Sequence, residues 1–370
     1  MTQQTLFLNG RYLCQGLTGV QRVAGNLVQA LDEELADSGA AHRWVLLHPR
    51  QAHPPALRCI EPRGVGPAGL NSHLWEQAVL PWAARRGQLV SLAGSSPWLT
   101  PHQVVMWHDA AIFDVPQAYT RSFVAWYQAL FRHLSRRARC VLTPSAFAAE
   151  RLRHWLTLPQ LAVLPASGDH ILSVGAEPSI LDRLELRGRP YFLAVASANP
   201  TKNLSLLREA HTRWANQAGG SHAAALVLVG GHNPRVFRTD SASATGGVCI
   251  ATGSVTDAEL KALYQQALAL VFPSVYEGFG IPPLEAMHCG CPVIAARAAS
   301  LPEVCGQAAH YIDPNDCDTL VAALDRLAHD AVHREQLQAA GHQRAMAFSW
   351  RASAQRLLTL LGQNAPSEPA

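Results

Sequence analysis

The sequence predicts an α/β protein with two Rossmann-like domains, each a doubly wound parallel sheet. The chain has 370 residues, enough for about two domains. Short apolar runs alternate with helical patterns, as in successive βαβ units. A strand, a loop and a helix occur in that order near residue 5 and again near residue 191, and this order opens a doubly wound domain. We place the first domain at residues 1–170 and the second at 185–348.

The composition indicates a globular protein. Hydrophobic residues make up 48% and charged residues 15%, so we expect large cores, with disorder only at the tail, 363–370. No apolar run reaches the roughly 18 residues that span a bilayer, and the N-terminus lacks a signal-peptide pattern. The eight cysteines are scattered, as free thiols in a reducing compartment would be. We therefore expect a cytoplasmic protein.

The charge is unevenly distributed. Met1–His170 contains 15 arginines and no lysine against 10 acidic residues, whereas the remainder contains 15 basic and 17 acidic residues. A basic N-terminal half suits an anionic acceptor or a membrane surface, so peripheral contact with the inner face of the cytoplasmic membrane is an expectation. We expect no nucleic-acid partner. The only lysines are Lys202 and Lys261.

The first predicted domain opens with a strand at 5–9, a glycine-containing loop at 10–19 and a helix at 20–35. The loop is not a G-x-G-x-x-G sequence, and no acidic residue ends a convincing second strand, which disfavours a dinucleotide site and a nicotinamide oxidoreductase. A strand at 44–48 follows. The Pro- and Gly-rich segment 49–71 is predicted to be loop, and a helix is predicted from His73 to about Arg86.

Two later features of this domain carry candidate functional residues. Strands at 89–92 and 103–107 lead to His108 and Asp109, at a carboxyl strand end, where ligands bind in open α/β sheets. A helix at 120–139 then ends in basic residues, which suit a helix C-terminus. The alternative is contact with acidic lipid headgroups or a lipid-diphosphate acceptor. These basic residues are Arg132, Arg136, Arg137 and Arg139.

The second domain opens with a strand at 191–195, a loop at 196–203 and a helix at 204–217. Lys202 lies just before that helix, and a point charge on a flexible stem is a natural phosphate partner. Strands at 224–229 and 248–251 follow, and Thr256 or Asp257 is predicted to cap the next helix. Asp316-Cys-Asp318 has a D-x-D spacing that some metal sites use, but we interpret Asp318 as a helix cap and expect no metal site.

The most informative stretch is residues 273–287, PSVYEGFGIPPLEAM, which follows an apolar strand. Gly278 and Gly280 allow backbone to approach a ligand closely, and the helix that starts beside them suits an anion such as phosphate. Glu277 and Glu285 bracket this turn. Carboxylates repel phosphate but bind sugar hydroxyls, so a sugar–diphosphate–ribose ligand fits the arrangement.

The E-x7-E spacing from Glu277 to Glu285, within EGFGIPPLEAMHCGCPVIA, resembles the donor-site motif of the retaining GT-B glycosyltransferases of family 4. The resemblance covers most of 1–361 and is strongest over 191–350. It implies the GT-B fold, with the two Rossmann-like domains facing across a cleft. It also implies that a last helix, 350–362, crosses back to the N-terminal domain, and that domain closure completes the active site.

The resemblance implies roles for particular residues. Glu277 contacts the transferred sugar, Glu285 holds the ribose and Lys202 binds the diphosphate. Because WHDAAIFDVPQAY resembles the family's N-terminal HD segment, His108 is expected to face the sugar or acceptor, with Asp109 orienting the loop. The catalytic candidates are thus His108, Lys202 and Glu277. The donor-binding candidates are Gly19, Ser197, Asn199, Lys202, Val255, Glu277, Gly278, Phe279, Gly280, Ile281 and Glu285.

Two of these assignments leave alternatives open. Gly19, in a loop that resembles the family's first glycine loop, is either a donor contact or a plain tight turn. The family often has a second basic residue in the donor loop, where this chain has Ser197 and Thr201. The sequence does not identify the residue that replaces it.

The implied function is transfer of a hexose, mannose being favoured, from a nucleotide-diphosphate sugar. GDP-mannose is the favoured donor and a UDP-sugar the next. The expected acceptor is a glycan or a lipid-linked sugar in bacterial surface polysaccharide or lipopolysaccharide assembly, and no metal or cofactor is expected. The alternatives are a GT-B sugar-nucleotide epimerase or hydrolase and a non-catalytic sugar-nucleotide-binding module. The donor, the acceptor, the linkage and the oligomeric state are not fixed by the sequence.

Overall fold

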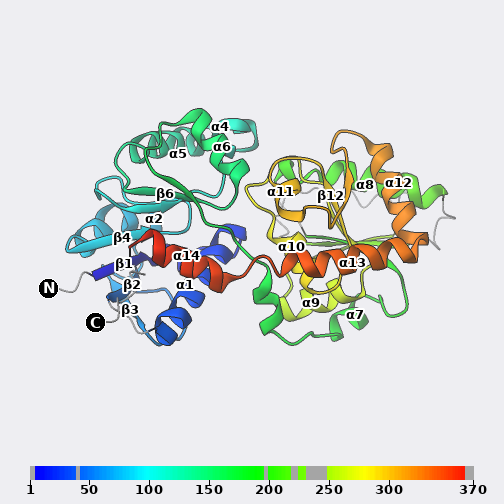
Figure 1. Ribbon diagram of the computed structural model, residues 1–370, viewed down its shortest axis with the longest axis horizontal. Helices are drawn as coiled ribbons and strands as arrows, with labels where there is room; N and C mark the ends of the chain where they lie inside the picture. The colour runs from blue at the N-terminus through cyan, green and yellow to red at the C-terminus, as the bar shows by residue number, and fades with distance from the viewer. Residues whose placement is uncertain (1–4, 39–41, 196–198, 218–223, 231–247, 363–370) are drawn as a thin grey trace, which may run out of the picture. The chain divides into compact units, whose positions relative to one another are not determined.

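The computed structural model describes residues 5–38, 42–195, 199–217, 224–230 and 248–362. The chain forms two compact units (Figure 1). The first unit comprises Met1–Ala166 and Ser349–Ala370, and the second comprises Ser167–Phe348. Each unit contains one sheet, and every strand pair in both sheets is parallel. The α/β fold class predicted from the sequence is confirmed.

The sheet of the first unit has the strand order β3-β2-β1-β4-β5-β6-β7. Its strands are β1 (Thr5–Asn9), β2 (Arg43–Pro49), β3 (Ile60–Val65), β4 (Gly87–Ser91), β5 (Val104–Met106), β6 (Cys140–Thr143) and β7 (Leu161–Val163). The order reverses between β1 and β4, because the chain builds outward from β1 to β3 and then returns to the other side of β1. Asn9 and Ser91 are the last residues of the two strands at this switch point.

Helices cover the faces of this sheet. They are η1 (Gly10–Cys14), α1 (Gly19–Ser38), α2 (Ser72–Leu74), the π-helix η2 (Trp75–Val79), α3 (Leu80–Ala83), α4 (Ala111–Asp114), η3 (Pro116–Ala118), α5 (Arg121–Leu134), α6 (Ala146–Trp155) and α14 (Trp350–Leu360). The buried rings of Trp107 and Phe131 stack at 4.0 Å between centroids, which fixes α5 on the sheet. α14 packs against α1, so the end of the chain belongs to the first unit (Figure 1).

The loop predicted at 49–71 is wrong for residues 60–65, which form the edge strand β3. Pro62 lowers the strand signal, but an edge strand tolerates proline because its outward backbone groups need no partner. The buried carboxylate of Asp32 on α1 also anchors the start of β3. It accepts the backbone N–H groups of Arg58, Cys59 and Ile60 at 2.7, 2.8 and 2.8 Å.

The helix predicted from His73 to about Arg86 is present, but it ends at Ala83 and contains a π-helical turn, Trp75–Val79. The Leu80 N–H donates to the carbonyl of Trp75, five residues earlier. Trp75 and Glu76 are both buried in this turn, with the Trp75 indole N–H bonded to the Val65 carbonyl at 2.8 Å. The pattern of apolar residues could not show that a glutamate is buried here.

The sheet of the second unit has the order β10-β9-β8-β11-β12-β13. Its strands are β8 (Tyr191–Val195), β9 (Ala225–Val229), β10 (Cys249–Gly253), β11 (Ala269–Phe272), β12 (Val293–Ala296) and β13 (His310–Ile312). The order reverses between β8 and β11, which are hydrogen-bonded neighbours with Phe192 opposite Ala269. The carboxyl ends of β8 and β11 therefore form the switch point of this unit.

The helices of the second unit pack on both faces of its sheet. They are η4 (Asp169–Ser173), α7 (Ser179–Arg183), η5 (Pro200–Lys202), α8 (Leu204–Gln217), α9 (Asp257–Gln266), α10 (Ile281–His288), α11 (Leu301–Cys305), α12 (Cys317–His329) and α13 (Ala331–Ala345). α8 and α12 lie side by side on one face, with Trp214 and Leu324 in their shared core (Figure 1). Of the two predicted caps, Thr256 and not Asp257 caps α9. Asp316, not Asp318, caps α12, because its carboxylate accepts the Asp318 N–H at 2.9 Å.

Candidate active site

Two candidate residues 75 positions apart meet at the switch point of the second unit. Lys202 ends η5, in the connection after β8, and Glu277 lies in the connection after β11. The Lys202 Nζ and a Glu277 carboxylate oxygen are 2.5 Å apart. The two side chains are 21% and 13% exposed, so this ion pair is accessible to a ligand.

Backbone and side-chain hydrogen bonds position Lys202. The Asn199 side chain accepts the Thr201 N–H at 3.1 Å and starts the turn of η5. Asn203 adopts the left-handed conformation, with φ of +54°, and its amide donates to the Pro314 carbonyl at 2.8 Å. The Val275 N–H donates to the Thr201 carbonyl at 2.8 Å, which ties the lysine loop to the segment that carries the glutamate.

Hydrogen bonds from the Ser300 hydroxyl fix the backbone of the glycine loop after Glu277. The Ser300 hydroxyl is buried and lies 3.0 Å from the Glu277 carbonyl and 2.8 Å from the Phe279 carbonyl. Gly280 has φ of +105°, and a Cβ there would lie 2.8 Å from a Leu301 methyl, so the position requires glycine. The buried Phe279 ring packs edge-on against Phe348, at 5.6 Å between centroids.

The start of α10 offers few amides, because Pro282 and Pro283 occupy its first turn and lack N–H groups. The N–H groups nearest the helix start are therefore those of Gly280 and Ile281, although Ile281 is itself buried. Together with the partial positive charge of the helix N-terminus, they suit an anion close to Lys202. Because the two prolines lack N–H groups, the backbone donors that an anion could use lie on the glycine side of this turn.

Glu285 lies on the buried face of α10 and is only 2% exposed. Tyr264 donates its hydroxyl to one carboxylate oxygen at 2.9 Å, and the Nε2 of His170 lies 2.9 Å from the other. Burial, with the charge of Glu285 next, raises the pKa of Tyr264 well above its usual value, so the hydroxyl remains a donor. A Cβ at Gly168 would lie 2.5 Å from the Glu285 nitrogen, so only glycine lets η4 approach this closely. The ribose contact of Glu285 stays a prediction.

Two other donor candidates have less defined surroundings. Val255 is half-buried in the connection between β10 and α9, two residues after Gly253, whose φ is +70°. Its contact with the nucleobase stays a prediction. Ser197 lies outside the described residues.

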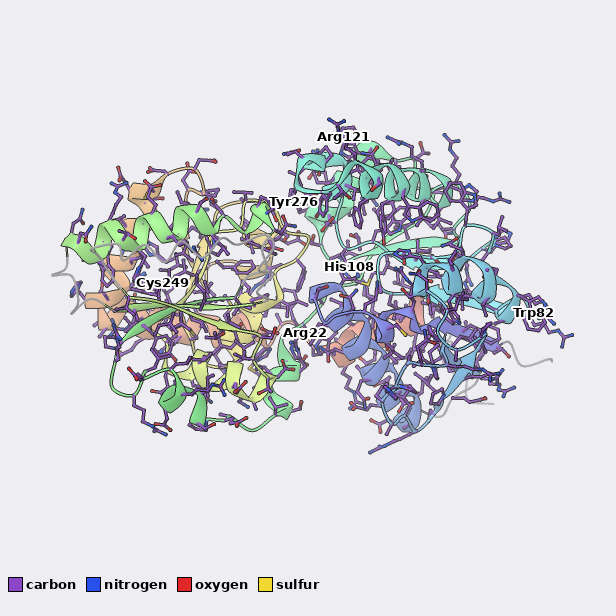
Figure 2. The ribbon with its side chains drawn as sticks, turned by 180° about the vertical axis from the view of Figure 1, so that it is seen from behind. Arg22, Trp82, His108, Arg121, Cys249 and Tyr276 are labelled. Carbon is purple, nitrogen blue, oxygen red and sulfur yellow. The ribbon has the colours of Figure 1, made fainter. Side chains whose placement is uncertain are left out.

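His108 directly follows Trp107 at the carboxyl end of β5 in the first unit and is labelled in Figure 2. Its Nε2 lies 2.9 Å from the Leu92 carbonyl oxygen, which can only accept, so Nε2 carries the proton and Nδ1 the lone pair. Burial lowers the pKa of His108 to about 4, so the ring is neutral at pH 7. Asp109 accepts the Ala111 N–H at 2.8 Å and orients the start of α4, as predicted.

The remaining candidates of the first unit gain no defined role from the structure. Gly19 is the first residue of α1, and a Cβ there would meet nothing within 4 Å, so sterics do not require glycine. In the basic run, Arg132 lies over the Phe113 ring at 5.3 Å and Arg139 donates to the Gln88 side chain at 2.8 Å. Donor contact by Gly19 and membrane contact by the arginines stay predictions.

The sequence reasoning missed three residues that organise this site: Ser300, His170 and Tyr264. Each reaches a candidate glutamate from a distant part of the chain. Only Ser300 has a local signal, since it precedes the LPEV helix start.

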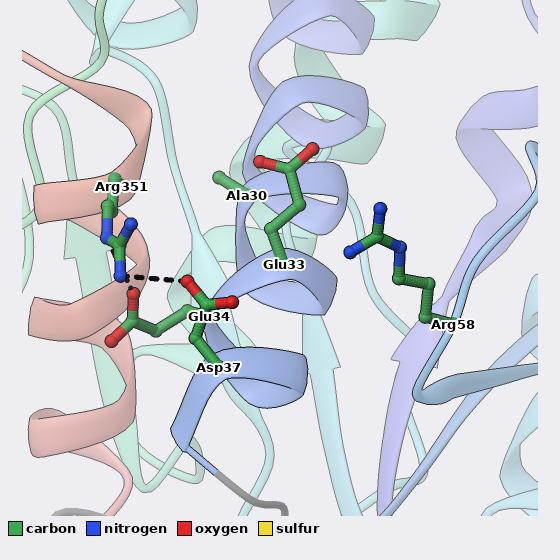
Figure 3. A pocket seen from close by; sticks show the side chains of 6 residues that line it. All are labelled: Ala30, Glu33, Glu34, Asp37, Arg58 and Arg351. Atoms are coloured by element: carbon green, nitrogen blue, oxygen red, sulfur yellow. Dashed lines mark hydrogen bonds and ion pairs between the residues drawn. The ribbon is translucent and has the colours of Figure 1, made fainter.

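Two surface pockets lie within single units. One, of about 250 Å³, is lined by residues of α1 and α14. There Arg351 forms ion pairs with Glu34 and Asp37 at 3.0 Å each (Figure 3). None of the predicted site residues lines it. The other, of about 440 Å³, lies at the carboxyl ends of β11, β12 and β13, and Val275 lines it two residues before Glu277. None of the predicted site residues, Lys202 and Glu277 included, lines this second pocket either.

Neither a metal-binding cluster nor a membrane-spanning helix occurs in the described ranges. Among these residues, no group of three or more His, Cys, Asp or Glu side chains could hold a metal ion. No helix in the described part of the chain combines the length and apolarity needed to cross a membrane.

Two doubly wound parallel-sheet units in one chain are the architecture of the GT-B glycosyltransferases, and the second unit carries an accessible lysine–glutamate pair at its switch point.

The chain belongs to the glycosyl transferases group 1 family, whose model matches residues 180–344. The O-antigen chain mannosyltransferase B of Escherichia coli is 30% identical over 279 residues, which is 73% of each protein. The serotype-specific mannosyltransferase WbdA of Escherichia coli is 30% identical over 196 residues, or 52% of this chain but only 23% of that protein. The enzyme is therefore a mannosyltransferase-like glycosyltransferase.

A solved structure supports the fold over the whole chain. Sucrose-phosphate synthase from Thermosynechococcus elongatus matches with a TM-score of 0.71 at 21% identity, covering 98% of this chain and 99% of that one. At this identity the similarity shows the architecture alone.

Proposed function

We propose that this glycosyltransferase moves mannose from GDP-mannose to a glycan or lipid-linked acceptor of a bacterial surface polysaccharide, with retention at the anomeric carbon. The accessible Lys202–Glu277 pair at the switch point of the second unit is the observation that carries the proposal. Two relatives, an O-antigen chain mannosyltransferase and a serotype-specific mannosyltransferase, support mannose as the sugar.

The pair suggests how the donor binds. Without a ligand, the ammonium of Lys202 and the carboxylate of Glu277 satisfy each other at 2.5 Å. A sugar diphosphate offers each a matching partner, phosphate oxygens for the lysine and hydroxyl donors for the glutamate. The exchange leaves both charged groups hydrogen-bonded, and it places the leaving diphosphate between Lys202 and the amides of Gly280 and Ile281.

In this mechanism the protein supplies preorganised charge rather than a covalent intermediate. Lys202 and the helix-start amides stabilise the diphosphate as its bond to the anomeric carbon breaks, and Glu277 orients the sugar. The acceptor hydroxyl oxygen bonds to that carbon on the same face, and its proton passes to the departing diphosphate oxygen. Glu285 takes the ribose and Val255 the base, and the Nδ1 lone pair of His108 accepts a hydroxyl of the sugar or acceptor. Because these groups carry the charge themselves, we propose that the reaction needs no metal or cofactor.

The test combines ligand binding and turnover. GDP, UDP, ADP and dTDP are compared in a thermal-shift panel, where a nucleotide at 100 times its dissociation constant stabilises the protein by about 2.7 kcal/mol. Transfer from GDP-mannose is then assayed with and without EDTA, and NMR of the product gives the anomeric configuration. We expect GDP to give the largest shift, and EDTA to leave the rate unchanged.

Glu277→Gln is the informative variant, because it keeps the size of the side chain and removes its charge. We expect a loss of about 100-fold or more in kcat, with the GDP shift retained. Glu335→Gln, an exposed position on α13 in the same unit, is the matched control and keeps full activity. Full turnover by Glu277→Gln contradicts the proposal. Release of free or isomerised sugar without an acceptor indicates a hydrolase or epimerase instead.

A further inference from the structure

A buried polar network fills the switch point of the first unit. Asn9, at the end of β1, donates to Glu76 at 2.8 Å and to Ser91, at the end of β4, at 3.2 Å. Ser95 donates to the same glutamate oxygen at 2.9 Å, and Arg11 donates to the other at 3.2 Å. Arg11 and Glu76 are only 3% and 1% exposed, so this ion pair cannot itself hold a large ligand.

A buried ion pair is a costly way to stabilise a fold, because removing two charges from water offsets most of their attraction. An apolar pair of the same volume would stabilise the unit at least as well. The network uses hydrogen bonds from two strand ends to hold Arg11 in one orientation. The side chain that the Arg11 guanidinium bonds outside this network is therefore a candidate for a positioned functional group.

The guanidinium of Arg11 reaches one exposed side chain, that of His73. Its Nη2 lies 2.7 Å from the Nε2 of His73. A guanidinium only donates, so Nε2 must accept, and the proton of the neutral ring sits on Nδ1. Burial and the charge of Arg11 both lower the pKa of His73, which keeps the ring neutral. Within the described part of the chain nothing bonds this Nδ1, so it presents an N–H donor at the surface.

His73 shares this sheet edge with His108. Leu92 accepts a hydrogen bond from His108, and three residues later Ser95 donates to Glu76. Gly94 lies between Leu92 and Ser95 in the chain, and a Cβ on Gly94 would lie 3.9 Å from the His108 ring. One short loop therefore contacts both His108 and the Arg11–Glu76 pair that holds His73, at the edge where ligands of open α/β sheets bind.

We propose that His73 binds the acceptor sugar by donating its Nδ1–H to an acceptor hydroxyl oxygen, with Arg11 and Glu76 as the pair that positions it. This inference rests on the proposed function and adds a residue to it. With Nε2 bonded to Arg11 and Nδ1 protonated, His73 has no free lone pair to take a proton. It orients the acceptor hydroxyl and is not a general base.

The test separates acceptor binding from donor binding. Methyl α-mannoside and α-mannobiose serve as acceptor probes with GDP-mannose as donor. Loss of one hydrogen bond predicts that His73→Ala raises the acceptor KM about 3- to 10-fold and leaves the donor KM unchanged. His73→Asn, whose amide N–H can reach a similar position, restores most of the affinity. His154→Ala, an exposed histidine on α6, is the control and changes neither constant.

A second readout follows the ring itself. Long-range ¹⁵N–¹H spectra, with the His73 signal assigned from His73→Asn, are expected to show a neutral ring protonated on Nδ1 whose signal shifts on adding α-mannobiose. Protonation on Nε2, or an acceptor KM within twofold of wild type in His73→Ala, overturns this inference alone. A wild-type enzyme that GDP does not stabilise and that transfers mannose to neither probe overturns the proposed function and this inference with it.

Discussion

The two units place oppositely charged residues at the same point of their sheets, but they use them differently. In the first unit, Arg11 and Glu76 are 3% and 1% exposed, and further hydrogen bonds surround the glutamate. In the second, Lys202 and Glu277 are 21% and 13% exposed. A buried pair is suited to holding other groups in place, whereas a pair that is open to solvent can exchange partners with a ligand.

The choice of cation matches this difference. The planar fork of Arg11 bonds Glu76 with one nitrogen and His73 with another, which suits a fixed bracket. The single ammonium of Lys202, on a flexible stem, can turn from Glu277 to a phosphate. The comparison predicts that breaking the first pair affects stability and that breaking the second affects catalysis.

The largest expected effect is on stability. Glu76→Ala leaves the charge of Arg11 buried and unpaired, and we expect it to lower the free energy of unfolding by about 3–5 kcal/mol. Urea denaturation measures it. Glu61→Ala, which breaks exposed ion pairs with Arg43 and Arg63, is the control and costs less than about 1 kcal/mol. Equal midpoints for Glu76→Ala and wild type would show that the first pair is not a structural bracket.

The second prediction concerns turnover. Lys202→Ala removes the cation proposed to stabilise the leaving diphosphate, and by comparison with a lost oxyanion-hole donor we expect kcat to fall about 100- to 1000-fold. Its melting temperature should stay close to that of wild type. Lys261→Ala is a close control, because this lysine, the only other one, bonds the Val174 carbonyl at 2.8 Å. If both lysine variants keep wild-type rates, the second pair is not a ligand site.

The smallest expected effect is on how the stability of the first unit depends on pH. The pKa of His108 is about 4 in the folded protein, against about 6.5 unfolded, so the unfolded chain binds the proton first as the pH falls. The stabilisation is complete above pH 6.5, and about 2–3 kcal/mol is lost as the pH falls to 4. His108→Gln, which can still donate to Leu92, should lose less stability over this window in urea titrations at each pH. Parallel curves for the two proteins would contradict the assigned burial.

How far the sequence predicts the fold depends on whether an element is decided locally. β8, α8 and the Thr256 cap were predicted at their observed positions, because apolar periodicity and capping residues are local signals. β3 was missed because the hydrogen bonds that fix its start come from Asp32, which lies on a helix earlier in the chain. The π turn at Glu76 was missed because its buried partners lie at the ends of two strands.

The candidate site divides in the same way. The spacing of Glu277 and Glu285, the two glycines and Lys202 could be read from the sequence, and the structure brings Lys202 and Glu277 together. The sequence did not show that Glu285 is enclosed by Tyr264 and His170, nor that Arg11 holds His73. Those contacts depend on which loops meet at a sheet edge, and single-sequence patterns carry no such information.

The return of α14 to the first unit has a consequence for synthesis. Residues 167–348 form one continuous segment that can fold as soon as it emerges, whereas the first unit must wait for a helix from the end of the chain. At about 5–20 residues per second, synthesis of residues 167–348 takes roughly 10–40 s, and for this further time the surface of α1 that α14 covers stays open to water and chaperones. If synthesis stops within the second unit, the first unit therefore lacks α14, and the surface of α1 that α14 covers stays exposed.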